Sequence, residues 1–194
     1  MSIRVIAGTA KGRRLKLVPG DSTRPIMDRV KESLFNIIGR SILDASFLDL
    51  FAGTGSVGIE ALSRGASYAL LTDIDVLAIQ TIKDNLKLTG FSVRAAVRKI
   101  DAFSLLRQKP DRAYEFIYIA PPQYKAMWSA ALLGVEQNRG WLHPDGSVIV
   151  QIDPTEYAPV ELNHFALYDE RRYGNTLLLF YHLESSQTED VSRG

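Results

Sequence analysis

The amino-acid sequence predicts an α/β fold built on a mostly parallel sheet, and three observations support this prediction. Short apolar segments alternate with helix-like segments from residue 46 onward. A glycine-rich turn follows the first of these apolar segments. The last two strand-like segments, 163–171 and 175–183, are joined only by the turn around Tyr173 and Gly174. The alternation implies parallel strands with right-handed crossovers, and the last pair implies an antiparallel hairpin at the sheet edge.

The first 40 residues predict a small β-hairpin followed by a helix. The segments 3–8 and 14–18 are strand-like and flank a turn that contains glycine and lysine. After Arg24 and Pro25, apolar residues recur at helical spacing as far as Ile38, and charged residues occupy the other faces. We expect this helix to pack across the ligand-binding end of the sheet.

The remaining elements follow in chain order. The first strand of the sheet spans 46–51, and a helix begins near Val57. The predicted organisation is a basic extension over 1–40, one compact domain over 41–184 and a disordered tail over 185–194. Further strands are expected near 67–73, 93–99, 114–119 and 146–152, and further helices near 76–88, 102–108 and 124–138.

The composition excludes several classes of protein. The chain contains no cysteine, so it has no disulfide framework, no cysteine-based zinc site and no thiol nucleophile. It also lacks an apolar segment of membrane-spanning length and the apolar core of a secretory signal. We therefore expect a cytoplasmic protein, or a plant organelle protein whose transit peptide has been removed.

The formal net charge of +1 conceals an asymmetry along the chain. Residues 1–40 contain nine Lys or Arg and three acids, which gives them a net charge of +6 and leaves −5 for the remainder. A flexible, solvated arm is one interpretation of this segment, and a polyanion-binding surface is the other. The hairpin pattern favours the second, because an ordered hairpin can direct cations at phosphates. The candidate phosphate-binding residues are Arg4, Lys11, Arg13, Arg14 and Arg24.

The segment from Asp49 to Gly58, Asp-Leu-Phe-Ala-Gly-Thr-Gly-Ser-Val-Gly, predicts a nucleotide-type site between a strand and a helix. Its glycines match the G-x-G-x-x-G spacing, in which the missing Cβ atoms allow positive φ, close approach of a ligand and close helix–strand packing. Asp73 ends the next strand, about 20 residues later, where an acid can hold both hydroxyls of a ribose.

Asp49 indicates which kind of nucleotide ligand this is. A carboxylate there repels a pyrophosphate but attracts a cation, so S-adenosylmethionine, with its ammonium and sulfonium groups, fits better than a dinucleotide. The alternative is a carboxylate satisfied by the backbone. Asp101 is a candidate ligand contact, a helix N-cap, or both, and Asp75 is expected to be a helix cap. The candidate cofactor contacts are Asp49, Phe51, Ala52, Gly53, Thr54, Gly55, Asp73, Ile74, Asp101 and Ala102.

On these segments the chain resembles the class I S-adenosylmethionine-dependent methyltransferases, and more narrowly the bacterial family that methylates the N2 amino group of a guanine in 16S ribosomal RNA. The narrower resemblance also includes 4–8, 11–15, 24–36 and 172–176, and it covers nearly the whole chain. It implies a Rossmann-like, seven-stranded sheet with a C-terminal antiparallel hairpin, and a methyltransferase domain over 41–184. It further implies a monomer that uses S-adenosylmethionine, binds no metal or membrane, and acts on 16S rRNA or an assembling small subunit.

The chain departs from this family after the strand over 114–119. The family has Asp-Pro-Pro followed by Phe or Tyr, which offers a carboxylate, a backbone carbonyl and an aromatic face to a flipped base. Here Ala120 replaces the acid and Gln123 replaces the aromatic residue. The backbone carbonyls of the double-proline segment remain, Gln123 is a replacement acceptor, and Tyr124 is a stacking residue. The candidate catalytic residues are Ala120, Pro121, Pro122, Gln123 and Tyr124.

Three functions remain open from the sequence. The first is guanine-N2 methylation of 16S rRNA. The second is an RNA-binding assembly factor that keeps the fold but has lost methyl transfer, because Ala120 removes the carboxylate. The third is a methyltransferase for a small molecule or a protein, for which the basic extension is incidental.

Overall fold

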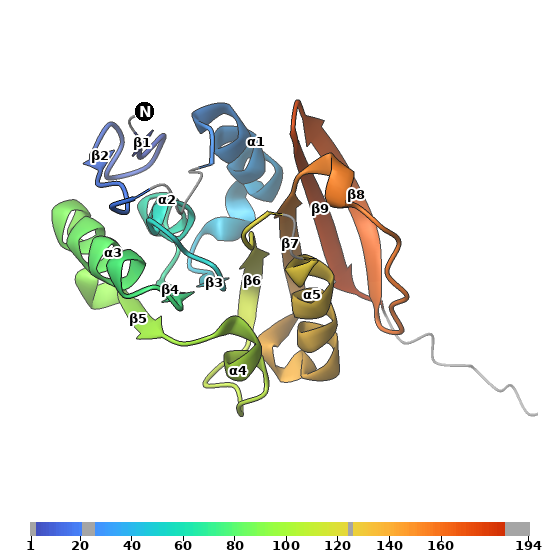
Figure 1. The fold of residues 1–194 in the computed structure, drawn as a ribbon. Helices are drawn as coiled ribbons and strands as arrows, with labels where there is room; N and C mark the ends of the chain where they lie inside the picture. Colours follow the sequence, from blue (N-terminus) through green and yellow to red (C-terminus); the bar gives the residue numbers. More distant parts are fainter. Residues whose placement is uncertain (1–2, 21–25, 124–125, 185–194) are drawn as a thin grey trace, which may run out of the picture.

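The computed structural model describes residues 3–20, 26–123 and 126–184 (Figure 1). The predicted RNA contact Arg24, the predicted catalytic residue Tyr124 and the predicted tail over 185–194 lie outside these residues. None of the helices in the described part of the chain is long and apolar enough to cross a membrane.

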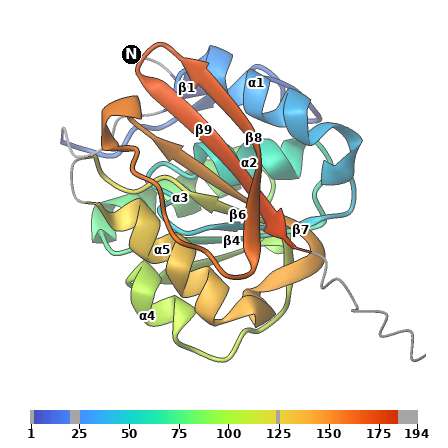
Figure 2. The same ribbon diagram turned by 90° about the vertical axis from the view of Figure 1, so that its right-hand side faces the viewer.

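A seven-stranded sheet with the strand order β5-β4-β3-β6-β7-β9-β8 forms the centre of the molecule (Figure 1), and β8 and β9 lie in front in the view of Figure 2. The first five strands of this order are parallel, and β9 pairs antiparallel with both β7 and β8. The predicted mostly parallel sheet with a closing hairpin at its edge is therefore confirmed. The strands are β3 (Ser46–Asp49), β4 (Tyr68–Asp73), β5 (Ala95–Lys99), β6 (Tyr114–Ile119), β7 (Leu142–Ile152), β8 (Phe165–Tyr173) and β9 (Thr176–Leu183).

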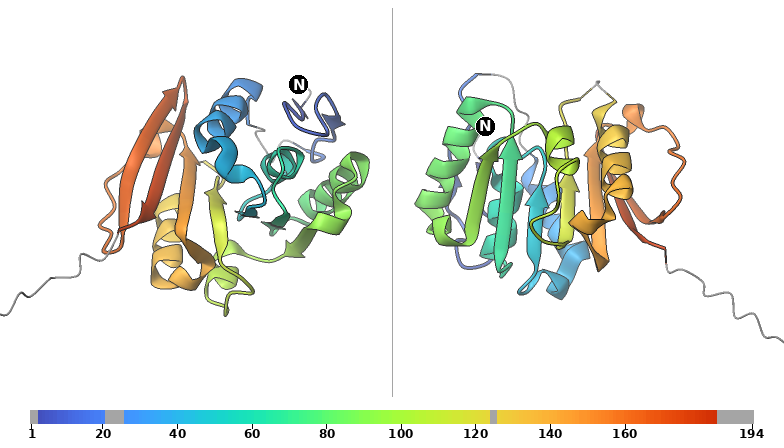
Figure 3. Two further views of the ribbon diagram at one scale, coloured as in Figure 1. Left: turned by 180° about the vertical axis from the view of Figure 1, so that it is seen from behind. Right: turned by 90° about the horizontal axis from the view of Figure 1, so that it is seen from below.

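Helices cover both faces of the sheet (Figure 3). Apolar residues of α1, α2 and α3 pack into one core cluster, and those of α4 and α5 pack into a second cluster on the opposite face. This is the layering expected when each parallel strand is followed by a crossover helix. The helices are α1 (Asp28–Ile38), α2 (Ser56–Ser63), α3 (Val76–Thr89), α4 (Ala102–Leu106) and α5 (Met127–Gln137).

Several element boundaries differ from the predicted ones, including the end of β3 at Asp49 rather than 51 and the position of β8, which begins and ends two residues later than predicted. The last helix begins at Met127, because the residue before it has a φ of 49°. The strand predicted from 93 begins at Ala95, since the three residues before it form a 3-10 turn. The strand predicted from 146 begins at Leu142, which pairs with Tyr114 ahead of an irregularity in the register. The short helix α4 ends at Leu106, two residues early.

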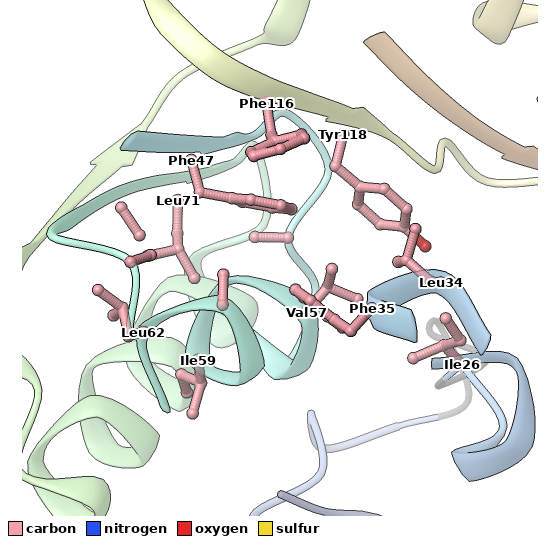
Figure 4. Close-up of a cluster of buried hydrophobic side chains, with 14 of the residues drawn as sticks. Ile26, Leu34, Phe35, Phe47, Val57, Ile59, Leu62, Leu71, Phe116 and Tyr118 are labelled. Atoms are coloured by element: carbon pink, nitrogen blue, oxygen red, sulfur yellow. The ribbon is translucent and has the colours of Figure 1, made fainter. Parts of the chain in front are cut away.

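The core on the α1–α3 side is the part of the fold that supports the ligand end of the sheet. Phe47 stacks on Phe35 of α1, with 6.2 Å between ring centroids, and contacts Phe116 and Tyr118 at 6.3 and 6.4 Å. Figure 4 shows these rings between the sheet and the helices, with Tyr118 facing Leu34 of α1. Because side chains alternate between the faces of a strand, Phe47 and Asp49 of β3 lie on this same face.

The N-terminal segment forms the predicted small hairpin, in which β1 (Ile3–Arg4) pairs antiparallel with β2 (Arg14–Leu15) beside α2 and α3 (Figure 1). Its strands are shorter than predicted. Gly8 has a φ of +81°, and a Cβ there would lie 1.8 Å from the backbone oxygen of Ser63. Only glycine fits at this contact between hairpin and helix. The hairpin is therefore packed against the domain rather than extended as a solvated arm.

A buried ionic cluster fixes this hairpin to α1 and α2. The Glu60 carboxylate accepts hydrogen bonds from the backbone N–H groups of Ile6 and Ala7, at 2.8 and 2.9 Å. The Lys31 ammonium, whose side chain is 1% exposed, lies 3.4 Å from Glu60 and donates to the Arg4 carbonyl oxygen at 2.6 Å. Burial lowers the pKa of Lys31, and the Glu60 carboxylate opposes this shift. Glu60 also pairs with the Arg64 guanidinium at 2.8 Å, so it is the removal of Glu60 that would leave the buried Lys31 charge uncompensated.

Candidate active site

The strand order places a ligand-binding crevice between β3 and β6. The chain runs from β3 outward to β4 and β5, then returns to the other side of β3 with β6 and β7. At such a switch point the crossover helices leave on opposite faces, so a crevice opens beyond the carboxyl ends of the strands. A cavity of about 780 Å³ lies there. It is lined by the segments after β3, β4 and β5 on one side, and by the segment after β6 and the end of β7 on the other.

The glycine-rich loop uses its glycines for two different reasons. Gly53 and Gly55 have φ angles of 54° and 77°, a backbone conformation that favours glycine. Gly58 lies within α2, where a Cβ would come 2.8 Å from the Cδ2 atom of Leu71 in β4. Two glycines therefore shape the turn and the third allows close helix–strand packing, as the motif predicts.

Asp73 braces this loop from the end of the neighbouring strand. Its Oδ2 atom accepts from the backbone N–H of Gly53 at 2.8 Å, and its Oδ1 atom accepts from the backbone N–H of Asp75 at 2.9 Å. The same carboxylate therefore fixes the loop and the start of α3, and it lines the cavity. A carboxylate held in this way is preorganised, because each oxygen has a second lone pair for a ligand hydroxyl.

Asp49 is the buried acid at the base of the cavity. It is 1% exposed, and its Oδ1 atom has no hydrogen-bond partner among the described residues. Burial, and then the nearby Asp73 carboxylate, raise the pKa of the Asp49 carboxyl to about 7, while backbone N–H groups of Gly58 and Phe51 oppose the shift. Backbone N–H groups therefore satisfy only part of this carboxyl, because Oδ1 has no partner among the described residues. A cationic group in the cavity would supply the missing partner.

Two further acids at the cavity are helix caps. The Asp75 Oδ1 atom accepts from the backbone N–H of Leu77 at 2.8 Å and begins α3, as predicted. The Asp101 Oδ1 atom accepts from the backbone N–H of Ser104 at 2.8 Å and begins α4. Asp101 also lines the cavity, and acting as a cap does not prevent it from contacting a ligand. That contact stays a prediction.

The structure brings the predicted cofactor and catalytic segments to one cavity. All the predicted cofactor contacts except Gly55 line it, and the double-proline segment lines the opposite side. Ala120 is partly buried and packs against the core cluster on the α1–α3 side. The residues of that segment at the cavity are Ala120, Pro121, Pro122 and Gln123.

Several cavity residues were not identified from the sequence. The two residues before α1, Ile26 and Met27, line the cavity, which agrees with the expectation that this helix packs across the ligand end of the sheet. From β7 comes Gln151, whose Oε1 atom accepts from the Tyr118 hydroxyl at 2.6 Å. A polar residue within the apolar strand 148–152 is the sequence signal for Gln151. Tyr118 gives no signal, because an aromatic residue in a buried strand is usually core.

The cations of the hairpin lie away from the cavity. Arg4 pairs with Asp28 through Nε and Oδ2 at 3.0 Å. Lys11, Arg13 and Arg14 are exposed and form no salt bridge within the described residues. This exposure leaves three cations on the tip and second strand of the hairpin accessible to a polyanion.

Asn85 of α3 joins the hairpin to the glycine-rich loop. Its Oδ1 atom accepts from the backbone N–H of Lys16 at 2.8 Å. Its amide nitrogen donates to the backbone oxygens of Lys16 and Thr54, at 3.0 and 2.9 Å. The side chain is 0% exposed, so its three hydrogen bonds are shielded from water.

No group of three or more His, Cys, Asp or Glu that could hold a metal occurs among the described residues.

Comparison with known proteins identifies relatives along the whole chain. Residues 3–182 match the protein family described as conserved hypothetical protein 95. YlbH of Bacillus subtilis (strain 168), which carries a provisional rRNA methyltransferase name, is 40% identical over 181 residues, or 92% of this chain and 98% of YlbH. Ribosomal RNA small subunit methyltransferase D of Escherichia coli (strain K12) is 32% identical over 189 residues, or 97% of this chain and 94% of that protein.

A solved structure also resembles this protein in its fold. The yhhF protein of Escherichia coli, which carries a provisional methyltransferase name, superposes with a TM-score of 0.84 and 33% identity, covering 95% of this chain and 99% of that one. The family match runs from the N-terminal hairpin to the final strand. The chain therefore belongs to the family described as conserved hypothetical protein 95 and is a homologue of the ribosomal RNA small subunit methyltransferase D proteins.

Proposed function

We propose that this protein transfers a methyl group from S-adenosylmethionine to the N2 amino group of a guanine in 16S rRNA. The observation that carries the proposal is the buried Asp49 carboxyl with its unpartnered Oδ1 atom at the switch point. A cationic, ribose-containing ligand fits this position, and two full-length relatives are named as methyltransferases of rRNA. The guanine and its N2 position come from the resemblance of the sequence.

The residues present fit S-adenosylmethionine at three points. Asp49 offers a carboxylate to the positively charged end of the ligand. Asp73, held by two backbone N–H groups, offers its remaining lone pairs to the ribose hydroxyls. Ile74 is 68% exposed beside the cavity, so an apolar adenine ring would cover surface that water now contacts. When bound, S-adenosylmethionine supplies an electrophilic methyl group on a positively charged sulfur.

The double-proline segment would hold the target amine. The lone pair of an exocyclic amine is delocalised into the base, so the amine attacks a methyl group poorly. Acceptors that bind its hydrogens localise the lone pair and align the nitrogen. The backbone carbonyls of Ala120 and Pro121 remain for this task, and Gln123 lies at the cavity with a side-chain carbonyl. The proposed stacking by Tyr124 lies outside the described residues.

The transfer balances without a metal or a covalent intermediate on the protein. The amine nitrogen donates its electron pair to form the new N–C bond, and the C–S bond breaks with its pair remaining on sulfur. The nitrogen, now cationic, loses one proton to water. The chain has to bind, orient and desolvate the two reactants, which is work for fixed acceptors rather than for a strong base.

The hairpin supports an RNA substrate. Lys11, Arg13 and Arg14 are exposed on an ordered element, and phosphate contacts from such cations provide most of the affinity of nucleic-acid binding. We therefore propose that the segment 1–40 is the RNA-binding extension. A 16S rRNA or an assembling small subunit would be the partner.

The decisive experiment maps N2-methylguanine in 16S rRNA from a strain in which the gene is deleted. We expect one guanine to lose its methyl group and to regain it when the purified protein and S-adenosylmethionine are added to the unmethylated particle. An unchanged methylation pattern would contradict the proposal.

A second function is favoured by one observation, the alanine at position 120. Without a carboxylate there, the protein could act as an RNA-binding assembly factor without methyl transfer. Calorimetry with S-adenosylmethionine distinguishes the two functions, because a protein that does not bind the methyl donor is not the enzyme. Binding without turnover on any small-subunit substrate would favour the assembly factor.

A further inference from the structure

Two polar side chains at the cavity have no part in the reaction described so far. The Tyr118 hydroxyl donates to the Oε1 atom of Gln151 at 2.6 Å, and both residues line the cavity. Tyr118 is 2% exposed, whereas Gln151 is only partly buried. A buried hydroxyl therefore holds an amide that is open to the cavity.

The strand register places Gln151 beside the substituted position. Strands β6 and β7 are parallel, and their last recorded pair is Ile119 with Val150. The next residue on each strand is Ala120 and Gln151. The two positions are therefore neighbours at the carboxyl ends of adjacent strands, about 5 Å apart across the sheet.

The side chains also share a face. Tyr118 and Ile149 belong to the core cluster on the α1–α3 side, while Val150 belongs to the cluster on the opposite face. Because side chains alternate along a strand, Gln151 lies on the same face as Ile149, and Ala120 packs against that same cluster. Asp49 pairs in register with Tyr118 on the other neighbouring strand. Gln151 thus faces the side of the cavity where the acid lies.

We propose that Gln151 is a catalytic acceptor for the target amine, replacing from the neighbouring strand the carboxylate that is missing at Ala120, and that Tyr118 is its positioning residue. This role rests on the proposed methylation of an exocyclic amine. It adds a residue that is distant in sequence from the double-proline segment.

The chemistry of the pair suits this role. An amide oxygen has two lone pairs, of which the Tyr118 hydroxyl uses one, so the second can accept a hydrogen from the amine. Burial, and then the nearby Asp49 carboxyl, raise the pKa of the Tyr118 hydroxyl well above its usual value, so Tyr118 remains a donor at neutral pH. Because the Tyr118 hydroxyl is a donor, it orients the Gln151 amide with its oxygen, rather than its nitrogen, toward the hydroxyl. Gln151 takes no proton, because a neutral amide is a very weak base, and the proton of the amine still leaves to water.

The test uses single-turnover methylation of small subunits from the deletion strain, with saturating S-adenosylmethionine. Gln151→Met removes the acceptor and keeps the length of the side chain, so we expect the rate to fall by about 10–100-fold. The Kd for S-adenosylmethionine, measured by calorimetry, should stay within about twofold, since no contact with the methyl donor is lost. Tyr118→Phe should reduce the rate by a smaller factor, about 3–10-fold, because the acceptor remains but is less well oriented.

Rescue separates an acceptor from a structural residue. Gln151→Glu should keep at least the wild-type rate, since a carboxylate also accepts hydrogen bonds. Ala120→Asp in the Gln151→Met background should recover at least tenfold, because it returns an acceptor to the neighbouring position. A Gln151→Met protein that methylates at the wild-type rate would overturn the role of Gln151, and so would a loss that neither carboxylate restores. A wild-type protein with no activity on these particles would instead overturn the proposed function itself.

Discussion

The two sides of the cavity are built in different ways. On the side of β3 and β4, the glycine-rich loop turns at Gly53 and Gly55, and the backbone N–H of Gly53 donates to the Asp73 carboxylate at the end of β4. On the side of β6 and β7, the polar groups come from strands whose paired residues, Tyr118 and Gln151, are 33 positions apart. The first side requires a backbone conformation with positive φ, which few residue types adopt. The second side requires a hydrogen-bonding atom at a given position in the cavity, which several types of side chain can provide.

This difference accounts for the expectation from the sequence resemblance, in which the glycine side matches the family and the segment at Ala120 departs from it. A glycine at positive φ has no good substitute, because any Cβ introduces strain. A hydrogen-bond acceptor can be supplied by an acid, an amide or a backbone carbonyl, and from a neighbouring strand. The following predictions test whether the glycine side binds the methyl donor and whether the other side only orients the amine.

The largest effect is expected at Asp49. Asp49→Asn removes the charge that would meet the cationic end of S-adenosylmethionine, so its Kd should rise by about 100-fold in calorimetry. The same change should raise the free energy of unfolding at pH 8 by a value on the order of 3 kcal/mol, because an ionised buried carboxylate is removed. Asp44→Asn, at an exposed position before the other end of β3, is the matched control and should change neither quantity. Tight binding by Asp49→Asn would remove the basis for placing the cation there.

The pH dependence of binding follows from the same carboxyl, whose pKa is about 7. Below pH 7 a proton must leave Asp49 before the cation binds, so affinity should fall by up to about tenfold per pH unit as the pH decreases. The stability of the ligand-free protein should change in the opposite sense. A raised pKa means that the folded state holds its proton longer, so stability falls as the pH rises from about 4 to 7 and is level above. Asp49→Asn should reduce both dependences, and a pH-independent affinity in the wild type would contradict the assignment.

A smaller effect is expected at Asn85, which connects the glycine side to the hairpin. Asn85→Ala removes hydrogen bonds to Lys16 and Thr54 and leaves buried backbone groups unpaired. We expect a loss of about 2 kcal/mol in the free energy of unfolding and a rise of up to about tenfold in the Kd for S-adenosylmethionine. Gln80→Ala, which removes one exposed hydrogen bond on the same helix, should change both quantities little. Equal behaviour of the two variants would show that the loop is held without the hairpin.

On the other side of the cavity, Gln123→Ala tests the acceptor within the double-proline segment. Its loss should reduce the single-turnover rate by about 3–10-fold and leave the Kd for S-adenosylmethionine unchanged, because it orients only the amine. An unchanged rate would exclude Gln123 as an acceptor. A change in the Kd alone would instead show that the two sides of the cavity are not as separate as the structure suggests.

The smallest effect per residue is expected for the exposed cations of the hairpin. Changing both Arg13 and Arg14 to Gln should weaken RNA binding several-fold and reduce the slope of log affinity against log salt by about 1–2. The Kd for S-adenosylmethionine should not change, since neither side chain lines the cavity. If the variant binds and methylates RNA like the wild type, the hairpin is not the RNA-binding element.

The sequence predicted the parts of the structure that local chemistry determines. The glycine-rich loop, the Asp75 cap and the closing hairpin depend on neighbouring residues, and all three are present. The start of β7 was not predicted because the sequence Pro-Asp-Gly at 144–146 is typical of a turn. Leu142 belongs to the strand through its pairing with Tyr114, which is distant in sequence. The Tyr118–Gln151 hydrogen bond depends on the register of two strands, which a single sequence does not specify.

The division at residue 40, the disordered tail, the guanine-N2 position and the role of each site residue stay predictions. The division is of interest because apolar residues of the hairpin, including Ile3, Val5 and Leu15, belong to the same core cluster as Phe47 of the sheet. Whatever its role in binding, the hairpin shares its packing with the rest of the chain.

The anchoring of the hairpin also has a consequence for the order of events during synthesis. The hairpin is made before its partners Glu60 and Asn85, which lie 53–54 and 69 positions further along the chain. Contacts with such separations form late, because a long loop must close before they are gained. The most basic part of the nascent chain therefore emerges without its native partners and remains so until α3 has been translated. During that interval Lys16 lacks its salt-bridge partner Asp84, so the segment carries more unpaired positive charge than the folded hairpin does.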